Sequence, residues 1–581
     1  MNKRFPFLVF CLLMFLSPFA FSQSGHMTLL AVSETENGYV GGTADLYLDI
    51  KPGSGRIFLE TFPFTKVDTQ MSTRFANEIA CDHLDIDCSQ YDFFYTLTAH
   101  SSIIGGPSAG AAIATLTSAM LLGLDIDEDV AITGTINSGG LIGPVGGLKE
   151  KVGAGSKMGL LKILIPKGEA LLSNETTRNE IFNQSTKKTQ IKEVYTLDEA
   201  IFEFTGKRIE REQNIEIDSQ YAATMGMLAK ELCDRTGTLS KESETKKEAP
   251  REGVLLASNL SMKGKAALDE GRLYSAASFC FGANVEYTRN ALLEDDLDEE
   301  EMTQISEKLM KDIGEFEEDL DSRAIRTITD LESFMVSKER VGEARDYANI
   351  ALNSSNTTEQ IGGIAWGTER LNSARSWSQF FGKEGRNYEF DEASLSSSCA
   401  LKIAEAQERV QYLELFLPLP LTSARAEITD AQKESDSRNY ELCLYKASKA
   451  KASVDIVLGV FGVEQQKFKE ILDVKLLRVK EMLAEESANG VFPILGYSYY
   501  EYAQSLAESD TLSALLYAEY ALELGNLDMY FKRSNGHAAA KQNPIDKKYL
   551  LVFSFGVIVG GIAVLAIRRG KVGANKKRVK K

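Results

Sequence analysis

Residues 105–110 read GGPSAG and place a single serine, Ser108, directly before an alanine-rich apolar stretch at 109–122. The two glycines allow a tight turn, and Pro107 cannot continue a strand ladder through this point. The apolar stretch predicts a buried helix, so Ser108 is expected at a helix N-terminus, where free N–H groups and the helix dipole can hold an oxyanion. An ordinary helix N-cap uses the same residue type, so these residues alone leave both roles open.

A serine hydroxyl is a weak nucleophile and needs a base. His100 lies shortly before Ser108, at the end of an expected strand, but no acid is placed to orient its ring. Residues 143–151 read GPVGGLKEK and offer Lys149 and Lys151 among apolar neighbours. Burial lowers the pKa of a lysine from about 10.4 and can make its amine a base at neutral pH. Because lysines two positions apart on a helix point to nearly opposite faces, only one of them is expected to face inward.

Together these segments resemble the proteolytic domain of Lon proteases in order and spacing. The segments are GPSAG at 106–110, ITGTI at 132–136, GPVGGLKEK at 143–151 and KILIPKGE at 162–169, preceded by GSGRIFLETF at 53–62. The resemblance implies a Lon-type fold with a Ser-Lys dyad. It implies that Ser108 is the nucleophile, that Lys151 is the base, and that the hydroxyl of Thr133 orients the lysine amine.

The resemblance also implies a groove in which substrate adds as an extended strand. The residues expected to line this groove are Gly106, Pro107, Ala109, Gly139 and Gly140. No metal or cofactor is expected, because the chain has no Cys or His cluster with zinc spacing and no G-x-x-x-x-G-K-[ST] motif. Lon enzymes unfold substrates with an ATPase, so the chain looks like the archaeal, membrane-anchored Lon-like proteases that lack one. Many relatives carry an acid where this chain has Gly105, which puts in doubt how the loop switches between inactive and active shapes.

The chain changes character near residue 206. Short β-rich runs alternate with helical patterns over 27–206, which predicts an α+β domain with a buried strand at Val130–Ile136. Over 210–532 strand patterns nearly vanish and Ala, Leu, Glu and Lys recur at helical spacing, which predicts a helical domain. Three similar stretches favour tetratricopeptide-type hairpins, with an ordinary helical bundle as the alternative. These stretches are 266–277, 431–447 and 506–518.

Both ends of the chain carry targeting patterns. Residues 1–22 combine basic residues, an apolar run and a small-x-small ending, which predicts a signal peptide, with an uncleaved anchor as the alternative. Residues 549–567 are apolar throughout and, at ~1.5 Å rise per residue, just span a bilayer core of ~30 Å. We therefore expect a transmembrane helix there, a stalk at 533–548 and a basic cytoplasmic tail at 568–581. The bulk of the protein is then expected on the outer face of the cell membrane.

Charge and cysteine content agree with an exported protein. The net charge is −18, and basic residues gather at the two ends, so the part between them is more acidic still. Such a surface is poorly suited to nucleic acid. Of seven cysteines, Cys11 lies in the expected signal peptide, and the others are an even set that predicts disulfides. The simplest pairing is sequential: 81 with 88, 233 with 280, and 399 with 443.

The sequence therefore predicts a membrane-anchored serine endopeptidase that needs no ATP. Without an unfoldase, its substrates are expected to be peptides, unfolded exported proteins or flexible segments of membrane proteins. Lon-like domains tend to form rings, so a homo-oligomer is expected from the resemblance alone. One alternative is a catalytically silent surface adaptor with a helical interaction domain. Another is a self-processing protein, with a cut in the polar segment 236–252, which reads as a mobile loop.

Overall fold

The computed structural model describes most of the chain between Gln23 and Ser534. The described ranges are 23–35, 38–99, 105–167, 181–182, 188–211, 214–245, 252–295, 297–414, 421–460 and 465–534. The predicted signal peptide, the transmembrane segment, the tail and nearly all of the stalk lie outside them. Within these ranges, no helix combines the length and the apolar character needed to cross a bilayer. The chain divides into two compact units, Met1–Lys532 and Arg533–Lys581, and the helices and strands of the described ranges lie in the first.

The first part of the chain folds around one mixed sheet, with strand order β3-β4-β2-β1-β5-β8-β9. Strands β1, β2 and β4 pair antiparallel, and the remaining neighbours in the sheet pair parallel. A separate antiparallel hairpin consists of β6 and β7. The strands are β1 (Gln23–Thr35), β2 (Gly38–Pro52), β3 (Ile57–Phe62), β4 (Tyr91–Ala99), β5 (Val130–Ile132), β6 (Thr135–Asn137), β7 (Leu141–Gly143), β8 (Lys162–Pro166) and β9 (Gln190–Val194).

Helices α2 (Val67–His83), α3 (Gly110–Leu121), α4 (Leu148–Met158) and α6 (Leu197–Thr205) complete this domain. Helix α3 is buried from Gly110 to Met120, which explains its apolar sequence. Its two buried threonines donate back to carbonyls of their own helix, so burying them leaves no unpaired hydroxyl. Because α3 is surrounded on all sides, the residue at its N-terminus is held in a fixed place.

The expected strand at Val130–Ile136 is interrupted in the structure. Thr133 and Gly134 lie between β5 and β6, and the backbone of Gly134 pairs with the start of α3 instead of with a sheet strand. A Cβ atom on Gly134 would come within 2.5 Å of Ile142, so only glycine fits here. The break allows the chain to leave the sheet and turn toward Ser108.

The remainder of the described chain is helical, and the predicted order of a mixed α and β domain followed by a mostly helical region is confirmed. Two of its helices begin at capping boxes, formed by Asp298 with Glu301 and by Thr327 with Asp330. The helices are α7 (Ser219–Thr245), α8 (Glu252–Asp269), α9 (Leu273–Glu294), α10 (Glu299–Asp321), α11 (Ile328–Asn353), α12 (Thr357–Trp377), α13 (Glu392–Glu414), α14 (Thr422–Asp436), α15 (Tyr440–Val460), α16 (Phe468–Ala488), α17 (Ile494–Leu506) and α18 (Thr511–Leu524).

The three similar stretches each span a helix, a turn and a second helix, at α8–α9, α14–α15 and α17–α18. The prediction of a loop at 236–252 was wrong for its first part, because α7 continues to Thr245. Thr236 is buried and donates to Asn284 on α9, so this part of α7 is packed against its neighbour. The polar composition of the segment belongs to the other, solvent-facing side of the same helix.

The three predicted disulfides are all present, and the sequential pairing is confirmed. Cys81–Cys88 ties the end of α2 to the following loop, Cys233–Cys280 joins α7 to α9, and Cys399–Cys443 joins α13 to α15. The last two bridges close long loops of the helical region, where cross-links restrict the unfolded chain most.

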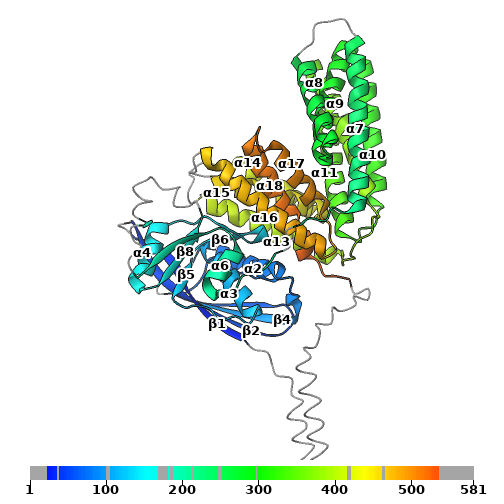
Figure 1. Ribbon diagram of the computed structural model, residues 1–581. Coiled ribbons are helices and arrows are strands. Elements are labelled where there is room, and N and C mark those ends of the chain that lie inside the picture. The colour runs from blue at the N-terminus through cyan, green and yellow to red at the C-terminus, as the bar shows by residue number, and fades with distance from the viewer. Residues whose placement is uncertain are drawn as a thin grey trace, which may run out of the picture. The chain divides into compact units, whose positions relative to one another are not determined.

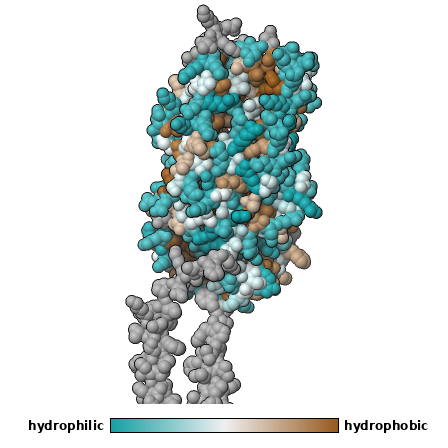
Figure 2. Space-filling model, turned by 90° about the vertical axis from the view of Figure 1, so that its right-hand side faces the viewer, coloured by the Kyte–Doolittle hydropathy of each residue, from teal (hydrophilic) through white to brown (hydrophobic). Residues whose placement is uncertain are grey.

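The helical region packs directly on the α/β domain. In Figure 1, α13, α16 and α18 adjoin the part of the domain that contains β6 and α2. Leu141 of β7 belongs to the same apolar cluster as Leu522 of α18, so one core is continuous across the two parts. Figure 2 shows a face of the molecule that is mostly hydrophilic, with hydrophobic residues scattered in small groups, as the acidic composition predicts.

Candidate active site

Ser108 lies in a single 3-10 turn, Pro107–Ala109, that leads directly into α3. The side chain is half-buried, whereas Pro107 beneath it is buried. Gly106 adopts a φ of 94°, a conformation that favours glycine, and this lets the backbone reverse just before the serine. The structure therefore places Ser108 at a helix N-terminus, as the sequence predicts.

Three side chains from the first turns of α2 hold this loop. Asp68 Oδ2 accepts from the N–H of Gly106 at 3.1 Å. Thr69 Oγ1 donates to the carbonyl of Gly106 at 3.5 Å, and Ser72 Oγ donates to the carbonyl of Pro107 at 3.4 Å. Because the C=O and N–H of a trans peptide point in opposite directions, the last bond turns the N–H of Ser108 away from α2.

Lys151 projects from α4 into the protein and is only 2% exposed. Its Nζ atom donates to Thr133 Oγ1 at 3.3 Å. Lys149, two residues earlier, is exposed, so the expectation that one of the two lysines faces inward is confirmed. A lysine this deeply buried requires polar partners, since an unpaired ammonium loses its hydration without compensation.

Thr133 and Gly134 connect the serine to the lysine. Thr133 is fully buried and anchored to β8 by its N–H, which donates to Leu164 O at 3.1 Å. The N–H of Gly134 donates to the carbonyl of Ser108 at 3.1 Å, and Ala111 N donates to Gly134 O at 3.0 Å. Two adjacent residues thus fix the two groups: Thr133 holds the Lys151 amine, and Gly134 holds the backbone of Ser108.

The residues predicted to line the groove divide into two sets. Gly106 and Ala109 are half-buried beside Ser108, and Pro107 between them is buried. Gly139 and Gly140 are buried, and a Cβ atom on Gly139 would lie 2.8 Å from Leu522 of α18. Gly139 therefore lies against the helical region, Gly140 lies against His83 and Leu197 of the α/β domain, and neither borders an open groove here. His100, the alternative base, is outside the described residues.

A histidine that the sequence did not single out is buried beside these glycines. His83, at the end of α2, pairs with Asp198 at 2.8 Å through Nε2, and Arg478 Nη2 approaches its Nδ1 at 3.2 Å. Burial lowers the pKa of His83 to about 4, and the neighbouring Arg211 contributes in the same direction. The ring is therefore neutral at physiological pH and can accept from Arg478, so its role here is structural.

One group of carboxyls in the described part of the chain has the spacing of metal ligands. Oxygen atoms of Asp82, Glu486 and Asp528 all lie within 4.8 Å of one another. Burial, with Asp528 close by, raises the pKa of Asp82 to about 7, and burial raises the pKa of Glu486 well above its usual range. Asp82 and Glu486 therefore keep protons nearer to neutral pH than ordinary carboxyls do, and the group joins α2 to the helical region.

Sequence reasoning also missed basic and aromatic residues of the helical region that touch the site's surroundings. Arg409 donates to the carbonyl of Ile136 at 2.5 Å, and Tyr412 accepts from Gly146 N at 3.0 Å. Both residues lie on α13, far from their partners in the sequence. Their one sequence signal is a charged or polar residue at helix positions that are otherwise apolar, which is too weak to identify a partner.

Comparisons with known proteins agree with the geometry. Residues 97–228 match the Lon protease (S16) C-terminal proteolytic domain, a segment that includes Ser108, Thr133 and Lys151. The chain is similar to the Lon protease of Clostridium beijerinckii, with 34% identity over 110 residues, which are 19% of this chain and 13% of that protein. It is similar to the Lon protease of Methanosarcina barkeri, with 28% identity over 155 residues, 26% of this chain and 19% of that protein.

A third relative is similar over a shorter and better matched stretch. The Lon protease of Rhizobium meliloti is 48% identical over 65 residues, which are 11% of this chain and 8% of that protein. The chain thus spans less than a fifth of the length of these relatives. The family model gives the position of the likeness: residues 97–228 include Ser108, Thr133 and Lys151 and leave most of the helical region outside.

Proposed function

We propose that this protein is a serine endopeptidase in which Ser108 and Lys151 form the catalytic dyad. One observation carries the proposal: a buried lysine donates to Thr133, and the next residue, Gly134, is hydrogen-bonded to the backbone of the only serine at the start of α3. The match to a Lon proteolytic domain supports the same assignment.

In the proposed reaction the neutral amine of Lys151 accepts the hydroxyl proton of Ser108. The serine oxygen attacks the carbonyl carbon of a peptide bond, and the resulting ammonium gives its proton to the leaving amine. Water then adds to the acyl ester, with Lys151 again as the base. In this proposal the bond to Thr133 orients the amine so that its lone pair can take the proton of Ser108.

The oxyanion is proposed to form beside the N–H of Ser108. Ser72 turns this N–H away from α2 by holding the carbonyl of Pro107. A backbone donor fixed in advance at the start of a helix stabilises developing negative charge without reorganisation during the reaction. Gly106 and Ala109, half-buried on either side, are the proposed wall of the substrate site.

We further propose that the enzyme acts without ATP, outside the cell and anchored to the membrane. The sequence supports this through its missing nucleotide-binding motif, its leader-like residues 1–22, the apolar residues 549–567 and the basic tail. The disulfides of the described region fit an oxidising compartment. Substrates are then loosely folded exported proteins or flexible segments of membrane proteins, and a ring-shaped homo-oligomer is the proposed assembly.

The experiment compares full-length protein in detergent with its Ser108→Ala and Lys151→Met variants on an unstructured protein substrate. The proposal expects hydrolysis by the wild type and loss of at least ~10³-fold in both variants. A silent adaptor would cleave nothing in any form. A self-processing protein would show one internal cut, removed by Ser108→Ala, and no cleavage of added substrate. Hydrolysis that survives either substitution would overturn the dyad.

A further inference from the structure

Three basic side chains of the helical region converge on one short segment of the α/β domain, residues 136–139. Arg409 Nη2 donates to Ile136 O at 2.5 Å, and Lys451 Nζ donates to Ser138 Oγ at 3.1 Å. Arg478 Nε donates to Gly139 O. The three residues come from α13, α15 and α16, so three separate helices bind nearly consecutive acceptors.

All three cations are withdrawn from water, with exposures of 2%, 0% and 3% for Arg409, Lys451 and Arg478. Burying a charge costs several kcal/mol unless opposite charges lie close. Each cation accordingly has an acid beside it, all contributed by the helical region. The ion pairs are Arg409–Asp455 at 3.2 Å, Lys451–Glu523 at 2.6 Å and Arg478–Glu481 at 3.2 Å.

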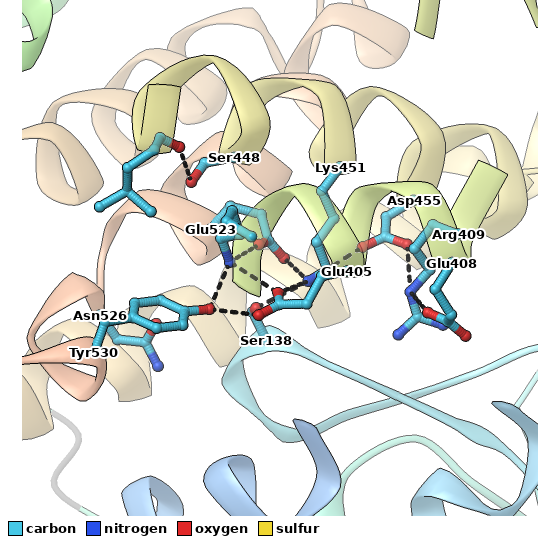
Figure 3. A network of polar contacts seen from close by, with 12 residues as sticks. Ser138, Glu405, Glu408, Arg409, Ser448, Lys451, Asp455, Glu523, Asn526 and Tyr530 are labelled. Carbon is cyan, nitrogen blue, oxygen red and sulfur yellow. Dashed lines mark hydrogen bonds and ion pairs between the residues drawn. The ribbon is translucent and has the colours of Figure 1, made fainter. Parts of the chain in front are cut away.

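Figure 3 shows Lys451 directed toward Ser138, with Glu405, Glu523 and Asp455 around its amine. The same ammonium lies 4.7 Å from the ring centroid of Phe75, on α2 of the α/β domain. Such a cation over an aromatic face adds attraction where water is excluded. Lys451 therefore contacts acids of the helical region on one side and Ser138 and Phe75 of the α/β domain on the other. An ion pair that only neutralised charge within the helical bundle would lack the second set of contacts.

The bound segment follows Thr133 and Gly134 after a single residue, Thr135. In the β6–β7 pair, Ile136 stands opposite Ile142, whose N–H donates outward to Tyr195 O. The polar groups of Ile136 therefore also point away from the hairpin, on the same edge as those of Gly134. On this edge, the N–H of Gly134 binds the carbonyl of Ser108. The next residue whose polar groups face the same edge is Ile136, and its carbonyl binds Arg409.

Helix α13 also reaches the turn that leads into α4. Tyr412 lies one turn after Arg409; its hydroxyl accepts from Gly146 N at 3.0 Å and donates to Pro144 O at 3.3 Å. One face of α13 thus contacts the strand that follows Thr133 and the turn that precedes Lys151. These are the two segments whose separation sets the distance between the threonine hydroxyl and the lysine amine.

We infer that the helical region is a fixed part of the catalytic scaffold, and that Arg409 and Lys451 are positioning residues for the Thr133–Lys151 pair. The inference rests on the proposed function. A detachable lid would not share an apolar core with the domain it covers, yet Leu141 packs in one cluster with Leu522 and its neighbours. The clamp, defined as Arg409, Lys451 and Arg478 with their acids, acts through the backbone of 136–139 and touches neither substrate nor reacting atoms.

The test measures kcat and KM of full-length Lys451→Met and Arg409→Met variants on an unstructured protein substrate. Loss of the clamp displaces Thr133 relative to Lys151, and misplacement of about 1 Å can lower a rate ~10²-fold. We expect kcat to fall at least ~10-fold with KM within twofold, and the acidic limb of the kcat–pH profile, which reports protonation of the base, to shift. Arg409→Lys, which keeps a donor, should recover part of kcat.

The matched control is Lys338→Met. Lys338 is also a buried lysine of the helical region and pairs with Glu317 at 3.0 Å and Asp321 at 2.8 Å, but these partners are on α10, away from the α/β domain. This variant should keep the wild-type kcat and pH profile. Hydrogen exchange of the peptide that contains 136–143 should accelerate in Lys451→Met and not in Lys338→Met.

The outcomes separate this inference from the proposed function. If wild-type protein shows no Ser108-dependent hydrolysis, the proposed function fails, and the exchange measurement alone decides whether the clamp holds 136–143. If hydrolysis depends on Ser108 but Lys451→Met and Arg409→Met keep kcat and the pH profile, the inference is overturned while the dyad stands. Should Arg409→Met not fold, Arg409→Lys and Lys451→Met decide the question.

Discussion

Lys151 and Thr133 are both buried, and the lysine Nζ lies 3.3 Å from the threonine Oγ1. The pair joins α4 to the link between β5 and β6. The position of the amine therefore depends on this link, which also binds the Ser108 backbone, and on α4, whose preceding turn contacts Tyr412 of the helical region. Most of the expected consequences of mutation follow from this dependence.

Replacing Thr133 tests the orientation of the amine. Thr133→Val keeps the shape and removes the acceptor, so we expect kcat to fall by ~10- to 100-fold with little change in KM. Thr133→Ser keeps the hydroxyl and should retain most of the activity. Steady-state kinetics across pH will check this; equal losses in both variants would mean that packing of the whole side chain, and not the hydroxyl alone, matters at this position.

Ser72 is expected to act on the oxyanion through the peptide plane of Pro107 and Ser108. Ser72→Ala should lower kcat by about 10-fold, because the N–H of Ser108 is then held less firmly. Thr73 is the matched control, since its hydroxyl donates to Thr69 O within the same helix at 2.7 Å. Thr73→Val should leave kcat unchanged, and a similar loss in both variants would indicate a general effect on α2.

Two adjacent glycines of β2 offer a test of where α4 lies. A Cβ atom on Gly41 would come within 1.9 Å of the carbonyl of Glu150, the residue before Lys151, whereas a Cβ on Gly42 meets nothing within 4 Å. We therefore expect Gly41→Ala to displace α4, lower stability by ~2 kcal/mol or more and abolish hydrolysis. Gly42→Ala should match the wild type in thermal unfolding and in rate.

Stability should fall as pH rises from about 6.5 to 7.5. Burial, with Glu405 nearby, raises the pKa of Glu78 to about 8, and the pKa of Asp82 is raised to about 7. Both carboxyls keep protons in the folded protein that the unfolded chain has already released, so the free energy of unfolding decreases with pH. His83, with its pKa lowered to about 4, has the opposite effect only below about pH 6.5, where the unfolded histidine gains its proton.

The measurement is the Tm by calorimetry at several pH values. We expect a decrease of roughly 2–5 °C over this interval, and a flatter profile for Glu78→Gln, whose amide remains neutral throughout. A Tm that rises with pH in the wild type would contradict the assignment of protonated carboxyls at the boundary between α2 and the helical region.

The sequence predicted the local features of the site well, because their causes are local. The glycines and proline around Ser108 determine a turn before an apolar helix, and the spacing of Lys149 and Lys151 determines that only one faces inward. The even cysteine count predicted disulfides, and the sequential pairing, which was only the simplest arrangement, is the one present.

The sequence could not predict the features that depend on distant partners. In the sequence, residues 130–136 have the pattern of one continuous buried strand. The strand is broken at Thr133 and Gly134 because Gly134 pairs with the start of α3, which the pattern does not show. Lys241 and Glu242 belong to a segment of loop-like composition, yet they are exposed residues of α7. The partners of Arg409 and Lys451 lie 273 and 313 residues away along the chain, and no periodic pattern indicates such pairings.

That separation has a consequence for how the protein is made. A chain synthesised from its N-terminus contains Ser108 and Lys151 long before α13, α15 and α18 are made. If the clamp is needed to align the pair, the proposed site remains idle until the final helices fold onto it. The late synthesis of Arg409 and Lys451 then has the effect of an inhibitory propeptide: it delays activity until the helical region is complete, and nothing has to be removed afterwards.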